Sequence, residues 1–385
     1  MNPASDLNFK KRCWAEIDLE ALRHNTAVIQ RRLGKAGIMA IVKANAYGHG
    51  ALPVVNELAP LVAAFGVANL TEAAQIAEIV EPGRVHILGT ALPEERGEIA
   101  RRGFVPVVSS SDEAAEFGRL AGSGPLPVTV AIDTGMGRIG IDEPHALAEL
   151  RKIAELPRIR IKSIGTHLPV ADEDESYTRE QLARFGRIVA ESRAAGIDAP
   201  IIHVLNSAGA IRFPGAGAFD MARIGLALYG SSPVESFQKE LRAVMTLKTR
   251  VTLVRDLPAG HGISYGRTFI TPRTMRVATL GIGYADGYQR RLSGQGAEAL
   301  IRGVRCPVLG RVTMDQVMVD VSALQGVEPD AEAVLLGRQG GEEIFAADLA
   351  RKAGTIAWEI FTGVSARVER AYLHPAGRPA HEGPA

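Results

Sequence analysis

A lysine, Lys43, stands at the end of an apolar run of the sequence, in A-I-V-K-A-N-A-Y-G-H-G. Apolar neighbours remove water from an ammonium group, which lowers its pKa and frees the amine as a base or as a nucleophile that forms a Schiff base. An exposed lysine that simply follows a strand is the alternative. Lys43 alone does not decide between the two.

Other polar segments share this position beside apolar runs. They are D-T-G-M-G-R at 133–138, His167 in G-T-H-L-P, Asn206 and Ser207 shortly after His203, and Arg223 in M-A-R-I-G-L-A-L-Y-G. Taken singly, each is explained by a turn, a helix cap or a buried histidine. Because the carboxyl ends of the strands in a parallel barrel meet at one mouth, their joint placement favours a shared site.

Eight short apolar segments must position these residues, and helical patterns lie between most of them. The segments are 38–43, 65–68, 85–88, 105–108, 128–132, 159–164, 201–205 and 222–228. They are apolar almost throughout, which is typical of parallel strands covered on both faces. The pattern predicts an α/β fold, a (β/α)8 TIM barrel. An open doubly wound sheet has the same alternation, but no G-x-G-x-x-G motif follows the first strand.

Capping residues predict where two of the helices begin. Thr71 precedes E-A-A-Q-I-A-E-I, and serines precede D-E-A-A-E-F near 109–111. A hydroxyl at this position accepts a hydrogen bond from a first-turn N–H.

The sequence changes character after about Arg242. Short β-rich runs are now separated by Gly, Pro and Asp turns, and helical signal is sparse until 346–353. This predicts a C-terminal, mainly antiparallel β domain. We expect a barrel domain at 1–240, whose extreme N-terminus is able to pack on the β domain, a β domain at 241–375, and a disordered Pro/Gly-rich tail at 376–385.

Composition argues against several classes of protein. Lys plus Arg number 44 and Asp plus Glu number 43, so the net charge of +1 does not suggest a nucleic-acid partner. Cys13 and Cys306 are too few for a disulfide framework and show no metal-ligand spacing. The N-terminus is polar, and no apolar stretch is long enough to span a bilayer. We expect a cytoplasmic protein without a metal site or a membrane partner.

Three motifs of the second half carry candidate residues. They are H-G-I-S-Y-G-R-T-F around Tyr265, G-Y-A-D-G-Y with Tyr284, and R-V-T-M-D-Q with Met314. By itself, a Gly–aromatic segment is usually a hairpin turn.

Taken together, the motifs closely resemble those of the pyridoxal-phosphate-dependent alanine racemase family, of fold-type III. V-K-A-N-A-Y-G-H-G, D-T-G-M-G-R, S-Y-G-R and G-Y-A-D-G-Y follow in family order, and the resemblance runs from about Trp14 to Tyr372. It implies a barrel, a β domain and pyridoxal 5'-phosphate as cofactor. It also implies a homodimer whose active sites combine one barrel with the partner's β domain, and interconversion of L- and D-alanine that supplies D-alanine for peptidoglycan.

The resemblance also implies a role for each matching residue. Lys43 matches the lysine that holds the cofactor as a Schiff base and acts as the base toward D-alanine, while Tyr265 matches the base toward L-alanine. Two bases on opposite faces are the simplest way to remove and return the α-proton. His167 matches the histidine that contacts this tyrosine, and Arg223 matches the arginine that faces the pyridine nitrogen. The other cofactor-binding positions, mostly at the phosphate, are Tyr47, Asn206, Ser207, Gly225, Leu226 and Trp358.

Substrate contacts follow from the same match. Arg138 and the backbone of Met314 correspond to the positions that hold the substrate carboxylate. The residues that match the access channel are Tyr284, Asp172, Arg290 and Arg311.

Two departures from the family pattern leave the substrate range open. Ala131 stands where many relatives carry a lysine, often carbamylated, and Trp358 stands where many carry a tyrosine. The alternatives are therefore a racemase for other or many amino acids, a barrel-type decarboxylase with the same cofactor, and a non-catalytic carrier of the cofactor. A decarboxylase is not expected to contain S-Y-G-R, and relatives of the carrier kind are single barrels.

Overall fold

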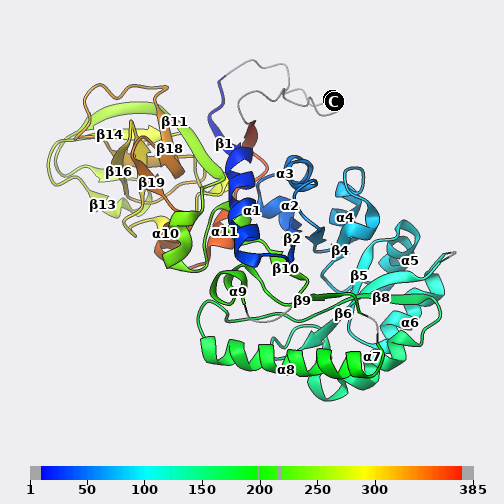
Figure 1. Cartoon of the computed structure of the whole chain (residues 1–385). Helices are drawn as coiled ribbons and strands as arrows, with labels where there is room; N and C mark the ends of the chain where they lie inside the picture. The colour runs from blue at the N-terminus through cyan, green and yellow to red at the C-terminus, as the bar shows by residue number, and fades with distance from the viewer. Residues whose placement is uncertain (1–9, 123, 198, 216–218, 375–385) are drawn as a thin grey trace. The chain divides into compact units, whose positions relative to one another are not determined.

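The computed structural model describes residues 10–122, 124–197, 199–215 and 219–374 (Figure 1). The chain divides into two compact units. One is Leu22–Arg242, and the other combines the described residues up to Ala21 with those from Ala243 onward. In these ranges no helix has the length and apolar character needed to cross a membrane. The tail predicted at 376–385 lies outside the described residues.

Parallel strands form the centre of the first unit. They are β2 (Gly37–Ile41), β3 (Ala64–Val67), β4 (Val85–Ile87), β5 (Val105–Val108), β6 (Leu126–Asp133), β8 (Ile159–Gly165), β9 (Ile201–His203) and β10 (Met221–Ile224). They pair in the order β5-β4-β3-β2-β10-β9-β8-β6, and β5 also pairs with β6, which closes the ring. Each predicted segment overlaps one of these strands, so the barrel is confirmed and the open sheet is excluded.

Helices follow most of these strands and lie outside them (Figure 1). They are α3 (Ala51–Leu58), α4 (Leu70–Ile76), α5 (Pro93–Arg102), α6 (Ser111–Leu120), α7 (Ala146–Ala154), α8 (Glu175–Ala194) and α9 (Ser207–Arg212), and α1 (Leu19–Leu33) precedes them. Their inner faces are apolar at helical spacing, as Ala146, Leu150 and Ile153 of α7 show. Each large buried side chain contributes about 1.5–3 kcal/mol to holding a helix on the strands.

One predicted cap is confirmed and the other is wrong. Helix α6 is capped by Ser110, whose hydroxyl accepts a hydrogen bond from the Glu113 N–H at 3.1 Å. Helix α4 begins at Leu70, and its cap is Asn69 rather than Thr71. Asparagine is at least as good an N-cap as threonine, so the helix starts at the first cap that follows β3.

The second unit is a mainly antiparallel sheet, as predicted. Its strands are β1 (Cys13–Asp18), β11 (Met245–Leu257), β14 (Met275–Leu280), β15 (Glu298–Ile301), β16 (Val304–Leu309), β17 (Val317–Asp320), β18 (Glu332–Gln339), β19 (Glu342–Ile344) and β20 (Glu369–Leu373). Strand β18 pairs with both β15 and β11, which closes a ring with β16, β17 and β14. Strand β1 lies between β11 and β20 and is parallel only to β20. Two helices, α10 (Ala346–Ala353) and α11 (Ala357–Thr362), follow β19.

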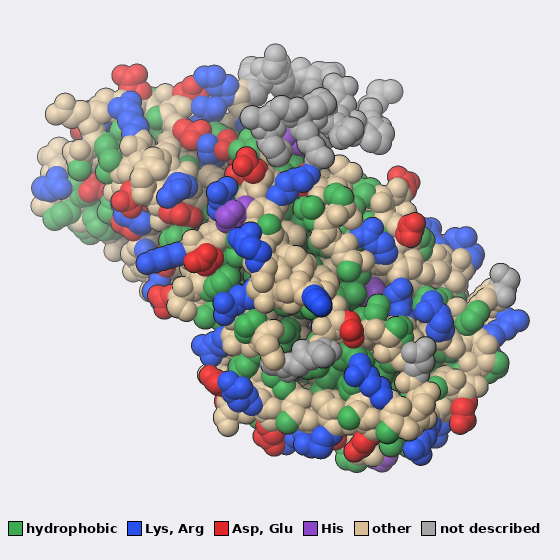
Figure 2. Space-filling model, viewed as in Figure 1, with side chains coloured by type: hydrophobic (Ala, Val, Ile, Leu, Met, Phe, Trp, Pro, Cys, Tyr) green, Lys and Arg blue, Asp and Glu red, His purple; other side chains and the backbone are tan. Residues whose placement is uncertain are grey.

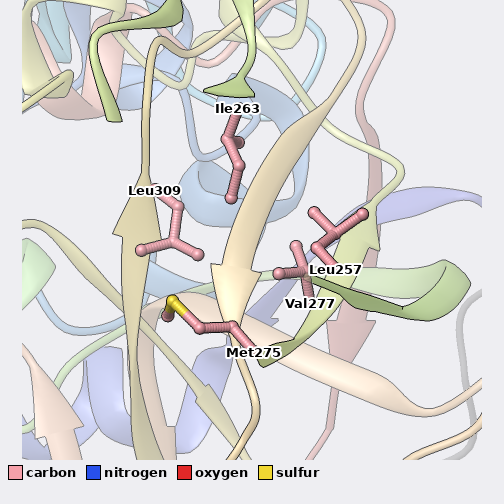
Figure 3. Close-up of a cluster of buried hydrophobic side chains, with 5 residues drawn as sticks. All are labelled: Leu257, Ile263, Met275, Val277 and Leu309. Carbon is pink, nitrogen blue, oxygen red and sulfur yellow. The ribbon is translucent and has the colours of Figure 1, made fainter. Parts of the chain in front are cut away.

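A cluster of buried apolar side chains lies where β11, β12 (Gly262–Ile263), β14 and β16 meet (Figure 3). Its members are Leu257, Ile263, Met275, Val277 and Leu309. Ile263 directly precedes Ser264 and Tyr265 in the chain. Its burial, worth about 1.5–3 kcal/mol, therefore anchors one end of the segment that carries Tyr265.

Charged side chains of both signs are interspersed on the face of the molecule that Figure 2 shows. This agrees with the near-zero net charge of the sequence. That face carries no extended surface of one sign of the kind that binds nucleic acid.

The segment that follows β2, labelled α2 (Lys43–Tyr47), is a left-handed turn. Ala44, Asn45, Ala46 and Tyr47 have φ angles of 51°, 55°, 53° and 51°. Each such residue costs roughly 1–2 kcal/mol relative to the right-handed form because Cβ approaches the following carbonyl oxygen. The surrounding structure must therefore enforce this conformation directly after the candidate lysine.

Side chains on both sides of the turn hold it. Glu72 of α4 accepts hydrogen bonds from the backbone N–H of Ala44 at 2.8 Å and of Ala68 at 2.7 Å. The side-chain amide oxygen of Asn45 accepts a hydrogen bond from the N–H of Ala51 at 2.7 Å, at the start of α3. The strained turn is thus tied to the two helices that flank it.

Replacing Ala44 with glycine should stabilise the protein. Ala44 is exposed, so no packing is lost, and relief of the left-handed strain outweighs the larger entropy of the unfolded chain by about 0.5–1 kcal/mol. Urea denaturation measures the difference. The matched control is Ala27→Gly at an exposed position of right-handed α1, which should destabilise by about 1 kcal/mol. A loss of stability in Ala44→Gly would contradict the strain assigned to the turn.

Candidate active site

Lys43 lies half-buried beyond the end of β2, at the mouth of the barrel. Burial lowers the pKa of its ammonium below the ordinary value, and the positive charge of Arg138 lowers that pKa further. The carboxylate of Glu72 opposes both effects. The net lowering increases the share of the nucleophilic free amine at neutral pH.

Arg223 of β10 is 8% exposed and is held by neutral acceptors. Its Nη1 donates to Nδ1 of His203 at 2.5 Å and to the His203 carbonyl at 3.0 Å. Its Nη2 donates to the carbonyls of Thr166 at 2.5 Å and Val204 at 3.0 Å, and to Nδ1 of His167 at 3.2 Å. Its Nε–H has no hydrogen-bond partner in the described part of the chain. The guanidinium is thus fixed with one donor remaining.

Both histidines beside Arg223 are neutral. Burial lowers the pKa of His167 to about 3, helped by the charges of Arg223, Arg138 and Lys43. Burial and Arg223 likewise lower the pKa of His203 well below its ordinary value. Arg223 itself stays protonated near neutrality, although burial and Arg138 lower its pKa to about 10. Because arginine can only donate, Nδ1 of each ring must be the acceptor.

Hydroxyl and N–H groups gather after β9 and β10. The hydroxyl of Ser207 accepts hydrogen bonds from the N–H of Gly225 at 3.2 Å and of Ala227 at 3.4 Å. A Cβ on Gly225 would lie 2.6 Å from the hydroxyl oxygen of Tyr47, so only glycine allows Tyr47 this close. Leu226 begins the short 3₁₀ helix that follows. Convergent donors of this type suit a phosphate at a barrel mouth.

Two more residues frame this group. Asn206 caps α9, since its side-chain oxygen accepts from the N–H of Gly209 at 2.9 Å, and its amide donates to the Leu168 carbonyl at 3.0 Å. The ring of Tyr47 lies 5.0 Å from the ring of Tyr229. The contacts of Asn206 hold the backbone at the start of α9, and the ring contact holds the hydroxyl of Tyr47.

The D-T-G-M-G-R loop is organised by its own aspartate. One carboxylate oxygen of Asp133 accepts from the N–H of Gly135 and Met136, and the other accepts from Gly137, all at 2.8 Å. Arg138 follows directly, with an exposed side chain. Asp133 thus acts through the loop backbone on the arginine that lowers the pKa of Lys43.

In the second unit, Tyr265 lies on a strained turn. Its side chain is 70% exposed, and the flanking Ser264 and Arg267 have φ angles of 63° and 46°. The Ser264 hydroxyl donates to the Arg311 carbonyl at 2.6 Å. Non-glycine residues with positive φ persist only where the surrounding structure enforces them, and they cluster at functional sites.

Tyr284 and Met314 lie on two loops that are joined by hydrogen bonds. The N–H of Tyr284 donates to the Thr313 carbonyl, and the N–H of Ala285 donates to the Met314 carbonyl, both at 3.0 Å. The side chains of Tyr284 and Met314 are exposed. The N–H of Met314 has no hydrogen-bond partner among the described residues and remains a donor.

The predicted site residues therefore divide between the two units. The barrel unit contains Lys43, Tyr47, Arg138, His167, Asn206, Ser207, Arg223, Gly225 and Leu226, and the β unit contains Tyr265, Tyr284, Met314 and Trp358. Hydrogen bonds or charge link Lys43, Arg138, His167 and Arg223. The described residues contain no cluster of three or more His, Cys, Asp or Glu that could hold a metal ion.

The two residues that depart from the family pattern, Ala131 and Trp358, both lie in regular elements of the fold. Ala131 is buried in β6 opposite Gly165 of β8, and its methyl group cannot pair with Arg138. Trp358 is half-buried on α11.

Sequence reasoning missed the part that Glu72 plays. The spacing of Asn69 and Glu72 is that of a capping box, and this was the available signal. Instead of closing back on its own helix cap, the Glu72 carboxylate accepts from Ala44 and Ala68.

Comparison with known proteins identifies the class. The family model for the alanine racemase N-terminal domain matches residues 17–233, and the model for the alanine racemase C-terminal domain matches residues 244–372. The chain therefore belongs to the alanine racemase family, which is dependent on pyridoxal phosphate and acts on alanine.

Individual relatives match along nearly the whole chain. The alanine racemase of Halothermothrix orenii is 40% identical over 371 residues, which cover 94% of this chain and 97% of that protein. The alanine racemase of Symbiobacterium thermophilum is 42% identical over 379 residues, covering 95% and 98%.

Solved structures of alanine racemases also align with this chain over nearly its whole length. Alanine racemase from Clostridium difficile 630 aligns with a TM-score of 0.88 at 31% identity, covering 95% of this chain and 97% of that one. The Bacillus anthracis alanine racemase with bound L-Ala-P aligns with a TM-score of 0.85 at 34% identity, covering 95% and 96%.

Replacing Arg138 with glutamine should raise the pKa of Lys43. Removing a nearby positive charge favours the ammonium form, so deprotonation moves to higher pH. The pH dependence of Lys43 modification by an amine-selective reagent, read by mass spectrometry on cofactor-free protein, measures this shift. Exposed Lys35 is the internal reference, and Arg119→Gln on α6 is the control substitution. An unchanged or lower midpoint in Arg138→Gln would overturn the assigned electrostatic coupling.

Proposed function

We propose that this protein is an alanine racemase that interconverts L- and D-alanine, with pyridoxal phosphate held covalently by Lys43, and that it supplies D-alanine for peptidoglycan. The observation that carries the proposal is Lys43 itself. Its amine has a lowered pKa at the mouth of a barrel that also contains the clamped Arg223.

The residues present fit the cofactor. Arg223 would offer its remaining Nε–H to the pyridine nitrogen, and the hydroxyls of Ser207 and Tyr47 would suit the phosphate. Asn206 and Leu226 frame that phosphate position, and Trp358 would contribute its indole N–H. When bound, pyridoxal phosphate withdraws electrons from the substrate Cα and makes its proton removable.

The protein's own residues would move that proton between two faces of the substrate. Lys43 acts as the base on one face and Tyr265 on the other. Since Nδ1 of His167 accepts from Arg223, its proton lies on Nε2, and His167 is a donor for the tyrosine oxygen. Arg138 and the Met314 N–H would hold the substrate carboxylate, and Tyr284 would narrow access to it.

We also propose that two copies of the chain share their sites, so that Tyr265 of the partner subunit completes each barrel. Tyr265 lies on a strained turn close in sequence to Arg267 and is 70% exposed. A catalytic base is not expected to be so exposed unless another surface covers it. Tyr284 and Met314 are also exposed on the same unit. Exposed aromatic and apolar side chains of this kind are typical of an interface.

A broad-specificity racemase is the second candidate, and Ala131 favours it. A methyl group at this position leaves Arg138 without the negatively charged side chain that many relatives place there. Arg138 thereby gains freedom to adapt to the carboxylates of larger substrates.

The first test is incubation of the purified holoenzyme with single-enantiomer amino acids in heavy water. Chiral chromatography follows inversion and NMR follows α-proton exchange. Inversion confined to L- and D-alanine is expected, while comparable inversion of larger amino acids would establish the second candidate. Loss of carboxylate would indicate a decarboxylase, and bound cofactor without turnover would indicate a carrier.

Tyr265→Phe should lower turnover of L-alanine by roughly 10²–10⁴-fold, and Tyr372→Phe on β20 is the control.

The shared-site proposal predicts complementation between two inactive variants. Lys43→Ala and Tyr265→Ala should each be inactive alone. When they are mixed and allowed to exchange subunits, half of the dimers are heterodimers with one intact site, which restores up to about a quarter of the original activity. Mixing two preparations of Lys43→Ala is the control. If no activity returns although mass spectrometry shows exchanged subunits, Lys43 and Tyr265 act within one chain.

A further inference from the structure

A line of buried polar side chains continues from Arg223 into the barrel. Nε2 of His203 lies 3.3 Å from the hydroxyl of Ser163, which lies 2.8 Å from the hydroxyl of Thr129. The Thr129 hydroxyl lies 3.1 Å from Nδ1 of His86. These four residues belong to β9, β8, β6 and β4, and each is at most 3% exposed. The proposed catalytic steps use none of Ser163, Thr129 and His86.

Arg223 determines the direction of the first bonds. A guanidinium can only donate, so Nδ1 of His203 must accept and cannot carry a proton. The neutral His203 ring then carries its proton on Nε2. That N–H donates to Ser163, the hydrogen-bond partner of Nε2 in the described residues.

Counting buried donors and acceptors gives the direction of the two remaining hydrogen bonds, Ser163 to Thr129 and Thr129 to His86. If Ser163 donates to Thr129 and Thr129 donates to His86, the unpaired group is Nε2–H of His86, which has no partner in the described part of the chain. In the opposite direction both the Ser163 proton and the His86 nitrogen would be unpaired. Each unpaired buried group costs about 1–3 kcal/mol, so the first arrangement is favoured.

We propose that Ser163 and Thr129 are positioning residues that stabilise the tautomer of His203 that Arg223 requires, because they provide the acceptor for its Nε2–H. Arg223 donates to His203, His203 to Ser163, Ser163 to Thr129 and Thr129 to His86. This one-way chain keeps the His203 acceptor facing Arg223 and leaves the Arg223 Nε–H as the donor for the pyridine nitrogen. The functional part of the inference rests on the proposed function, whereas the tautomers do not.

The charge states of the hydrogen-bonded side chains agree with this positioning role. Burial, with the nearby charge of Lys162, lowers the pKa of His86 to about 3, so the last member of the chain is neutral like His203. No carboxylate pairs with Arg223 in the described residues. An arginine held only by neutral acceptors keeps its positive charge uncompensated and remains a strong donor toward a ligand.

Histidine ¹⁵N NMR of the holoenzyme tests the tautomers directly. The protein has nine histidines, and loss of single signals in His86→Gln and His203→Gln assigns the two that matter. Both should show a protonated Nε2 and an unprotonated Nδ1 at neutral pH. A protonated Nδ1 on His203 in the unaltered protein would overturn the proposal, and this measurement requires no variant other than those used for assignment.

Two conservative variants test the positioning role. Ser163→Ala should move the His203 signal toward the other tautomer, because its Nε2–H loses its acceptor. Ser163→Ala and Thr129→Val should each lower kcat by about five- to tenfold while KM for alanine stays within about twofold, since the carboxylate contacts lie elsewhere. Unchanged kcat and an unchanged His203 signal in Ser163→Ala would refute the role.

The control is Thr26→Val on α1. Thr26 is nearly as deeply buried as Thr129, but its hydroxyl donates to the Leu22 carbonyl of its own helix. This variant should leave kcat and the His203 signal unchanged. If the protein does not racemise alanine, the proposed function fails while the NMR result still decides the tautomers. If racemisation is intact and His203 shows the wrong tautomer, only the present inference fails.

Discussion

The pairing of β5 with β6 is the constraint on which the barrel site depends. It turns eight parallel strands into a ring, so that all their carboxyl ends open at one mouth. Residues far apart in the sequence then meet there, Lys43 from the first strand and Arg223 from the last. Without this closure, the same strands would form an open sheet with no common centre for these side chains.

The charge of that mouth follows from the same closure. Lys43, Arg138 and Arg223 all bring positive charge to one place, and burial together with this charge keeps the neighbouring His167 and His203 neutral. A site of this kind suits two anions at once, a phosphate and a carboxylate. Besides burial, Arg138 lowers the pKa of both Lys43 and Arg223, so the same concentration of charge that attracts anionic ligands also favours a free amine on Lys43.

The sequence was sufficient for the architecture and for the motifs, and insufficient for what depends on closure. Apolar runs located every barrel strand, because parallel strands covered on both faces leave that pattern. The left-handed turn at Ala44–Tyr47 was invisible, since alanine gives no sign of positive φ and the surrounding contacts impose it. His86, Thr129 and Ser163 each look ordinary in their strands, and only the ring brings them into contact.

The position of β1 has a consequence for synthesis on the ribosome. Residues of β1 leave the ribosome before those of the barrel, yet β1 lies between β11 and β20, and β20 ends at Leu373. Strand β1 therefore has neither of its partner strands, β11 and β20, while the barrel sequence is translated. The barrel is in effect a long insertion inside the β unit. If the barrel folds before β20 is synthesised, it brings the two ends of the β unit together and so reduces the entropy that β1 loses when it pairs.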